Sequence, residues 1–275
     1  MHLKSLNNYR SGFVTLLGRP NVGKSTLINK LIGEKITITS PIAQTTRKKL
    51  KGILTTQNGQ IIFVDTPGVH KPHHRLGEIL VKNAKKAIKG VDIVIFVLDS
   101  SKEPGRGDEY IKCFLSDSQT EYIVALNKWD LVDKQFKNLR LEQYQKFFGT
   151  KKNLLTVSAS QGEGCSQVLE KVFTFLPEGP KLYEEDILCD QPLDNLLSDL
   201  VREQVLINTR EEVPHSVAVK IEQRKEMKRK NGKSFTAILA TIIVERISQK
   251  GILIGKKGSM LKIIGQSARS NMSKL

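Results

Sequence analysis

The chain has 275 residues, 39% of them hydrophobic, so it can bury one large core or two ordinary ones. Its 44 lysines and arginines outnumber 28 acidic residues, and the formal net charge of +16 favours a polyanionic partner, either RNA or an anionic membrane surface. The three cysteines are far apart in the sequence, which argues against a disulfide framework or a cysteine zinc site and favours a reducing cytosol. No apolar run approaches the roughly 20 residues of a membrane-spanning helix.

A segment with two prolines around a glycine, "LPEGPK" at 176–181, predicts a linker between two domains. We expect a first domain over residues 1–178, a linker over 179–190 and a second domain over 191–275. The last part is the most densely basic, because residues 214–275 carry 14 basic and 3 acidic side chains. We therefore look for the polyanion-binding surface in the second domain.

The first domain contains repeated apolar runs of strand length, separated by segments of helical character such as 24–32 and 77–89. The runs are "FVTLLG", "QIIFVD", "VDIVIFVLD", "EYIVALN" and "NLLTVS". Continuous hydrophobicity is typical of strands buried on both faces, so we expect an α/β fold with a mainly parallel sheet and helices on both sides. Ligands of such sheets bind at the carboxyl ends of the strands, which is where the polar motifs fall.

The stretch "GRPNVGKS" at 18–25 fits the P-loop pattern G-x-x-x-x-G-K-[ST] directly after a strand and at the start of a helix. Its glycines let backbone N–H groups point at phosphate oxygens, and the helix N-terminus adds its positive dipole end. Lys24 would reach the β- and γ-phosphates, Ser25 would bind Mg²⁺, and Thr26 would contact an α-phosphate oxygen. The phosphate-binding residues that we expect are Gly18, Arg19, Pro20, Asn21, Val22, Gly23, Lys24, Ser25 and Thr26.

The stretch "DTPG" at 65–68 follows the strand "IIFV". Asp65 would hold Mg²⁺ through water, and the Gly68 N–H would face the γ-phosphate. We expect nucleotide contacts from Asp65, Thr66, Pro67, Gly68 and Val69.

The stretch "NKWD" supplies base specificity after the strand "EYIVAL". The Asp130 carboxylate can accept hydrogen bonds from N1–H and N2–H₂ of guanine, whereas adenine offers no donor there and would leave a desolvated charge unpaired. In "VSA", which closes the last strand, a backbone N–H would turn toward guanine O6. The expected guanine-binding residues are Asn127, Lys128, Trp129, Asp130, Ser158 and Ala159.

The ordered set GRPNVGKS, DTPG, NKWD and VSA resembles the G1, G3, G4 and G5 boxes of translation-factor-class small GTPases. The resemblance implies GTP and GDP as ligands and places a switch threonine in "SPIAQTTRKK". Thr46, or its neighbour Thr45, would meet Mg²⁺ in the GTP state, so the expected metal ligands are Ser25, Thr46 and Asp65. We expect Lys24, Thr46 and Gly68 to act in catalysis.

One position departs from the Ras pattern, because Val69 stands where a water-orienting glutamine follows the D-x-x-G box. Either intrinsic hydrolysis is very slow, or a catalytic group or a K⁺-like monovalent cation comes from elsewhere. The neighbouring His70, His73 and His74 have H-x-x-H spacing, but without nearby cysteines or paired carboxylates we favour a solvated loop over a metal site.

The second domain begins with an apolar stripe of helical spacing from Leu193 to Val205, with Asp190 and Pro192 at its start and Asp190 as the N-cap candidate. Two strand-like runs follow, "SVAVKIEQ" and "SFTAILATIIVERI", with "RKEMKRKNGK" as the turn between them. In this turn we expect Arg224, Lys225 and Lys228 either to contact an RNA backbone or only to solvate a hairpin tip.

The stretch "GILIGKKGSM" fails the P-loop pattern but satisfies G-x-x-G at Gly255, Lys256, Lys257 and Gly258. The order helix, strand, strand, helix, G-x-x-G, helix resembles a type II KH domain, whose loop clamps the backbone of about four single-stranded nucleotides. Glycines let phosphates approach, lysines supply charge, and Ile252, Ile254 and Leu261 would form an apolar groove for bases.

Together the two halves resemble the bacterial Era family of GTPases, most particularly in "SPIAQTTR", "DTPGVHKP" and "ILIGKKGSMLKIIG". The resemblance implies a GTPase that binds 16S rRNA near its 3′ end and acts in maturation of the small (30S) ribosomal subunit, with peripheral association with anionic membranes. We also expect the protein to be cytoplasmic and a monomer. Family members continue into a further strand, so we expect the KH-like sheet here to lack its last strand. Two alternatives stay open: a nucleotide-gated RNA-binding protein with negligible hydrolysis, and a GTPase whose main role is at a membrane.

Overall fold

The computed structural model describes residues 9–39, 50–65, 88, 90–118, 120–149, 154–209, 213–228, 232 and 234–273. The chain divides into two compact units. The first comprises Met1–Thr37 and Thr46–Asp190, and the second comprises Ile38–Thr45 and Gln191–Leu275.

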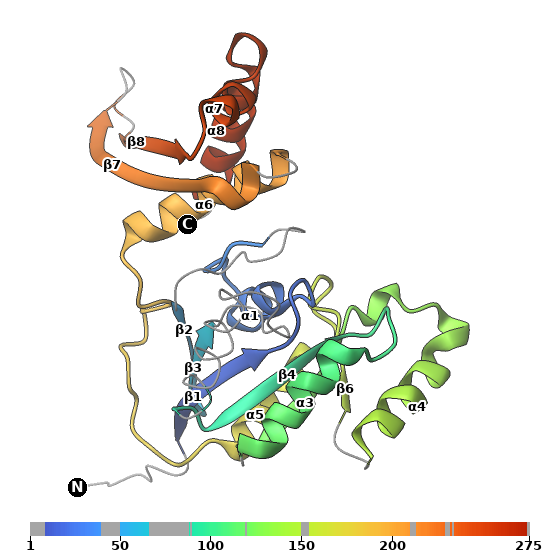
Figure 1. The fold of residues 1–275 in the computed structure, drawn as a ribbon. Coiled ribbons are helices and arrows are strands. Elements are labelled where there is room, and N and C mark those ends of the chain that lie inside the picture. Colours follow the sequence, from blue (N-terminus) through green and yellow to red (C-terminus); the bar gives the residue numbers. More distant parts are fainter. Residues whose placement is uncertain are drawn as a thin grey trace, which may run out of the picture. The chain divides into compact units, whose positions relative to one another are not determined.

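The first unit is built on a sheet with the strand order β2-β3-β1-β4-β5-β6 (Figure 1). β2 runs antiparallel to β3, and the other neighbouring pairs are parallel, which confirms the expected α/β fold with a mainly parallel sheet. The strands are β1 (Arg10–Leu17), β2 (Leu50–Thr56), β3 (Gly59–Asp65), β4 (Ile93–Asp99), β5 (Tyr122–Asn127) and β6 (Leu154–Thr156). β2 is absent from the runs recognised in the sequence, since "LKGILTT" mixes polar and apolar residues as an edge strand does.

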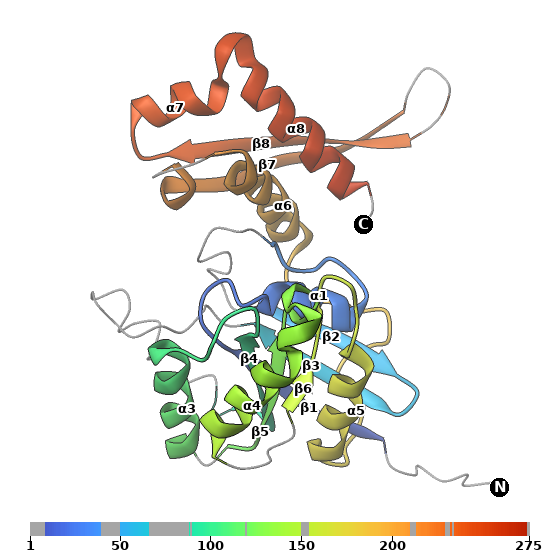
Figure 2. The ribbon, with the colours of Figure 1, turned by 90° about the vertical axis from the view of Figure 1, so that its right-hand side faces the viewer.

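Helices cover both faces of this sheet (Figures 1 and 2). They are α1 (Lys24–Ile32), α3 (Arg106–Ser118), α4 (Lys137–Phe148) and α5 (Cys165–Phe175), with short 3₁₀ turns at Trp129–Leu131 and Lys134–Phe136. Alternate strand residues pack on opposite layers: Ile95 lies in the core with α1 and α5, whereas Phe96 lies in the core with α3 and α4. All seven residues of β4 are buried because the strand is central and covered on both faces.

The segment expected to link the domains lies along the free side of β2. The Ile53 N–H donates to the Leu188 carbonyl at 2.8 Å, and Asp190 and Lys51 exchange two hydrogen bonds through the Asp190 N–H (3.1 Å) and its carboxylate (2.9 Å). Backbone groups of Lys51 and Ile53 on the edge strand are thus satisfied. The interpretation of Asp190 as an N-cap is wrong: α6 begins at Leu193, its N-cap is Pro192, and no side chain caps it.

The second unit contains α6 (Leu193–Asn208), a 3₁₀ turn (Val213–Ser216), β7 (Val217–Lys228), β8 (Ser234–Val244), α7 (Ile247–Ile254), a 3₁₀ turn (Lys256–Gly258) and α8 (Ser259–Met272). This is the expected order of elements. β7 and β8 form an antiparallel pair, and in the part of the unit that the structure describes the sheet has these two strands. Buried apolar residues of α6, α7, α8 and β7 make up a separate small core.

β7 extends further than the sequence pattern indicated. Arg224, Lys225 and Lys228 pair in register with β8 residues, so they lie on the strand and not in the turn, which corrects the expected position of these three residues. No helix among the described residues is long and apolar enough to cross a bilayer.

Candidate functional site

The P-loop joins β1 to α1 at the carboxyl edge of the sheet, and two of its glycines are required by its geometry. Gly23 has a φ of 94°, in the left-handed region, and a Cβ there would lie 2.3 Å from the Asn127 side-chain nitrogen. A Cβ on Gly18 would lie 2.3 Å from the Val97 carbonyl oxygen. The loop can therefore take this curled shape only with glycine at both positions.

The Lys24 side chain lies against the backbone of the P-loop. It is the first residue of α1, is 8% exposed, and its ammonium donates to the carbonyl oxygens of Gly18 (3.1 Å) and Arg19 (3.0 Å). These two bonds hold the ammonium inside the curl of the loop. Its positive charge and its place at the N-terminus of the helix suit a phosphate oxygen.

Asn127 links the phosphate loop to the two loops that are expected to contact the base. Its amide nitrogen donates to the Val22 carbonyl of the P-loop at 2.8 Å, and its amide oxygen accepts from the Ala159 N–H at 3.0 Å. The side chain is buried, with 2% exposure. The P-loop, "NKWD" and "VSA" are thus brought together by one residue, as the sequence motifs require.

The remaining residues that we expect to bind the base lie around this link. Asp130 is exposed, and the Ser160 hydroxyl approaches its carboxylate at 3.4 Å. The Trp129 N–H donates to the Val157 carbonyl at 3.0 Å, which joins "NKWD" to the strand end before Ser158. The Ala159 N–H is bonded to Asn127, so a backbone N–H of "VSA" directed at guanine O6 stays a prediction.

Lys128 is held by a carboxylate that the sequence analysis missed. Asp99, at the end of β4, accepts a hydrogen bond from the Lys128 ammonium at 2.6 Å and one from the Ser101 hydroxyl at 2.5 Å. Burial alone would raise the pKa of Asp99, but the bonds from Lys128 and Ser101 outweigh it and lower the pKa. The signal in the sequence was an acid at the end of an apolar strand, next to the strand that carries "NKWD" in this sheet.

Several expected site residues, and the three histidines expected in a solvated loop, lie outside the residues that the structure describes. These are Thr45, Thr46, Thr66, Pro67, Gly68, Val69, His70, His73 and His74. Asp65 ends β3, parallel to β1, so its backbone is at the same edge of the sheet as the P-loop.

A second missed group fixes the chain after α1. The Asn29 side chain accepts from the Thr37 N–H at 2.9 Å and donates to the Thr37 carbonyl at 2.8 Å, while the Thr37 hydroxyl lies 3.2 Å from the Ser25 carbonyl. Thr37 thereby anchors the segment that leads to the expected switch to the helix that carries Ser25. Both residues look like ordinary polar positions in the sequence.

In the second unit, the G-x-x-G loop connects α7 to α8 with an unusual backbone. Gly255, Lys257 and Gly258 all have positive φ, at 70°, 53° and 79°. A Cβ on Gly255 would lie 2.8 Å from Met260, whereas one on Gly258 would meet nothing within 4 Å. Lys256 and Lys257 are exposed. The loop therefore offers two ammonium groups beside glycine backbone, a combination that suits phosphate contacts.

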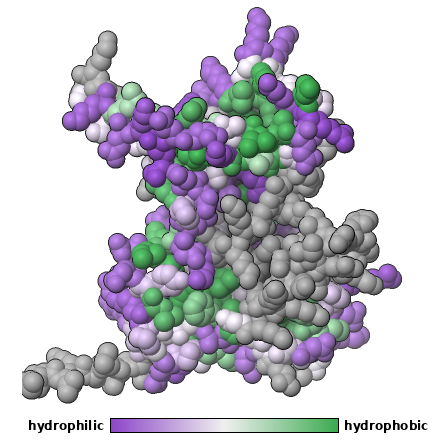
Figure 3. Space-filling view, turned by 60° about the vertical axis from the view of Figure 1, so that its left-hand side comes forward, coloured by the Kyte–Doolittle hydropathy of each residue, from purple (hydrophilic) through white to green (hydrophobic). Residues whose placement is uncertain are grey.

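Apolar side chains are exposed on both sides of this loop. Ile252 is 51% exposed and Leu261 is 42% exposed, and Ile254 between them is 37% exposed. Figure 3 shows hydrophobic side chains gathered among polar ones on the surface of the second unit. Their exposure leaves them accessible, and their contact with unpaired bases stays a prediction.

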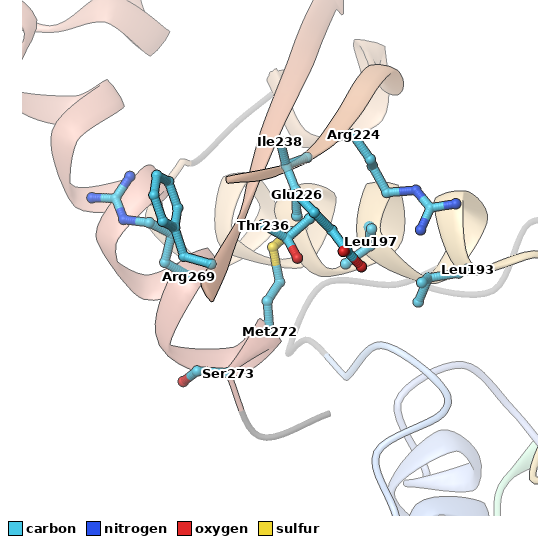
Figure 4. A pocket seen from close by; sticks show the side chains of 10 residues that line it. Leu193, Leu197, Arg224, Glu226, Thr236, Ile238, Arg269, Met272 and Ser273 are labelled. Atoms are coloured by element: carbon cyan, nitrogen blue, oxygen red, sulfur yellow. The ribbon is translucent and has the colours of Figure 1, made fainter. Parts of the chain in front are cut away.

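Arg224 is exposed, but its side chain is paired with a carboxylate and lies at the edge of a cavity. Its guanidinium pairs with the Asp194 carboxylate at 2.5 Å, and it lines a cavity of about 860 Å³ between α6, the hairpin and α8 (Figure 4). The lining residues are Leu193, Leu197, Arg224, Glu226, Phe235, Thr236, Ile238, Arg269, Met272 and Ser273. Arg224, Lys225 and Lys228 are all exposed, and a contact of any of them with RNA stays a prediction.

Comparison with protein families gives two matches. Residues 13–128 match the family model of the 50S ribosome-binding GTPases, and residues 212–275 match that of the KH domain.

Comparison with individual proteins gives matches over nearly the whole chain. The chain is 49% identical to GTPase Era of Rippkaea orientalis over 97% of this chain and 83% of that protein, and 48% identical to GTPase Era of Thermotoga maritima over 96% and 86%. Among solved structures, it is similar to Era in complex with MgGDPNP and nucleotides 1506–1542 of 16S ribosomal RNA (36% identity, TM-score 0.87, 96% of this chain and 89% of that one). It is also similar to a point variant of Aquifex aeolicus Era bound to GDP·AlF₄⁻ (36% identity, TM-score 0.85, 96% and 88%).

Proposed function

The chain belongs to the Era family of GTPases, and we propose that its nucleotide state controls its binding to 16S rRNA during maturation of the 30S ribosomal subunit. It is a GTPase, converting GTP and water to GDP and phosphate. The observation that carries the nucleotide part is the Asn127 side chain, which ties the phosphate loop to both base-reading loops. The Asn127 amide is used in these two bonds, and the exposed Asp130 carboxylate is the group that we assign to bind guanine.

The described residues fit GTP with Mg²⁺. The curled P-loop with its helix N-terminus and the buried Lys24 ammonium form a cradle for phosphates. Mg²⁺, when bound, would neutralise charge on the β- and γ-phosphates, and Ser25, Thr46 and Asp65 (through water) are the residues we assign to hold it.

We assign each protein group a limited role in hydrolysis. Lys24 binds the β- and γ-phosphates and stabilises negative charge that develops as the γ-phosphate leaves, and the Gly68 N–H faces that phosphate. Thr46 would close over the metal in the GTP state. Because Val69 cannot orient a water molecule, turnover should be slow until RNA, the ribosomal subunit or a monovalent cation supplies what is missing.

The second unit is the RNA-binding part in this proposal. Lys256 and Lys257 contact phosphates beside Gly255 and Gly258, and Lys225 and Lys228 extend the basic surface along β7. One similar protein was solved with 16S rRNA nucleotides 1506–1542, which makes this RNA the natural first ligand to try. We keep the domain limits 1–178 and 191–275 as part of the proposal, to be checked by limited proteolysis.

A multiple-turnover GTPase assay, with and without an RNA of nucleotides 1506–1542, tests the proposal. We expect slow turnover alone and faster turnover with the RNA. No turnover under either condition, together with GTP-dependent RNA binding, would favour a nucleotide gate without hydrolysis. No RNA binding in either nucleotide state would refute the RNA part.

We further propose that the protein acts in the cytoplasm as a monomer, with peripheral membrane association as a secondary property. The net charge of +16 supports attraction to anionic lipid. Flotation with phosphatidylserine vesicles at about 150 mM salt measures it. Binding only to these vesicles, and not to RNA, would move the main role to the membrane.

A further inference from the structure

A buried carboxylate outside the sequence motifs is bonded to the P-loop. Asp108 lies in the first turn of α3, and its side chain is fully buried, with 0% exposure. One carboxylate oxygen accepts from the Arg19 Nε–H at 2.8 Å, and the other accepts from the Gly105 N–H at 2.9 Å. Asp108 and Arg19 are 89 positions apart in the sequence.

The cost of burying this carboxylate points to a role beyond the helix. Burial raises the pKa of Asp108 although hydrogen bonds from Gly105 and Arg19 oppose it. A folded pKa above the unfolded one means that the ionised form destabilises the fold at neutral pH. The bond to Gly105 is half of a capping box and would stabilise α3 by itself, but it does not require an arginine partner.

Arg19 connects this carboxylate to the phosphate-binding lysine. Its carbonyl oxygen is one of the two that accept from the Lys24 ammonium, at 3.0 Å. Arg19 precedes Pro20, which restricts its backbone to extended conformations. Fixing its side chain therefore limits the orientations left to its carbonyl. Gly107 makes room for the arginine stem, because a Cβ there would lie 2.7 Å from Arg19 Cδ.

We propose that Asp108 is a positioning residue of the nucleotide site: it holds Arg19, whose carbonyl orients the Lys24 ammonium toward the phosphates. The inference rests on the proposed GTP site and adds to it a residue that touches no nucleotide. Its effect should be confined to ligands that carry the phosphates reached by Lys24.

The test measures dissociation constants of fluorescently labelled GDP at about 25 °C, with unlabelled GMP as competitor. Asp108→Asn should weaken GDP binding about tenfold, which corresponds to the loss of one charge-assisted hydrogen bond. GMP binding should weaken much less. Glu109→Gln is the matched control, because it removes an exposed acid from the same turn of α3 and should leave GDP binding unchanged. Equal losses for GDP and GMP, or GDP binding within about twofold of wild type, would overturn the proposal.

A double-mutant cycle with Arg19→Ala tests whether Asp108 acts on GDP binding through Arg19. If Asp108 acts through Arg19, Asp108→Asn should cost no further GDP affinity in the Arg19→Ala background, and additive losses would contradict the route. If Asp108→Asn does not fold, Gly107→Ala replaces it in the test, because the added methyl group crowds the Arg19 stem and leaves both charges in place. Unchanged GDP binding by folded Gly107→Ala would also refute the proposal. Failure of wild type to bind GDP would instead refute the GTP site itself.

Discussion

Asn127→Ala is the sharpest test of how the nucleotide site is assembled. The substitution removes the donor to the Val22 carbonyl and the acceptor for the Ala159 N–H, both buried in the structure. Each buried group left unsatisfied costs about 1–3 kcal/mol, so the expected loss in free energy of unfolding is about 2–6 kcal/mol. Since domains are stable by about 5–15 kcal/mol, the loss should be large enough to measure and small enough to leave folded protein at low temperature.

The assay is urea denaturation followed by fluorescence of Trp129, the single tryptophan, which lies in the 3₁₀ turn that directly follows Lys128. The midpoint should fall with little change in slope. Asn138→Ala is the control, because Asn138 is exposed on α4 and its loss should change the free energy by less than about 0.5 kcal/mol. Equal midpoints for Asn127→Ala and wild type would refute the idea that this amide holds the three loops together.

Three further outcomes are expected. Asp130→Asn should replace an acceptor that guanine needs by a donor and shift preference toward xanthine nucleotides in a competition assay. Unchanged GTP affinity would contradict the assignment of Asp130 to guanine recognition. Replacing Lys256 and Lys257 by Asp should abolish binding of the 16S RNA segment and leave GDP affinity intact, whereas loss of both would make the loop structural. Because the folded pKa of Asp99 is lowered, its stabilisation is present above the unfolded pKa of about 3.9 and is lost as pH falls through the folded value. Asp99→Asn should therefore lower the melting temperature at about pH 7 and have a smaller effect at about pH 2.5.

The sequence by itself determined the features that depend on local pattern. Continuous apolar runs predicted the central strands, the helical character of 24–32 after the P-loop pattern predicted α1, and G-x-x-G predicted the turn between α7 and α8. Such patterns can be read because glycine conformations, helix starts and hydrophobic periodicity are set within a few residues.

Only the tertiary structure decided which distant residues meet. Asp190 looked like a helix cap, yet it bonds to Lys51, because the linker lies along an edge strand that the sequence pattern did not indicate. The contact of Asn127 with Val22 spans 105 positions, and the contact of Asp108 with Arg19 spans 89. Contacts of this kind follow from the order of strands in the sheet and from the geometry at its carboxyl edge, and neither leaves a periodic signal in the chain.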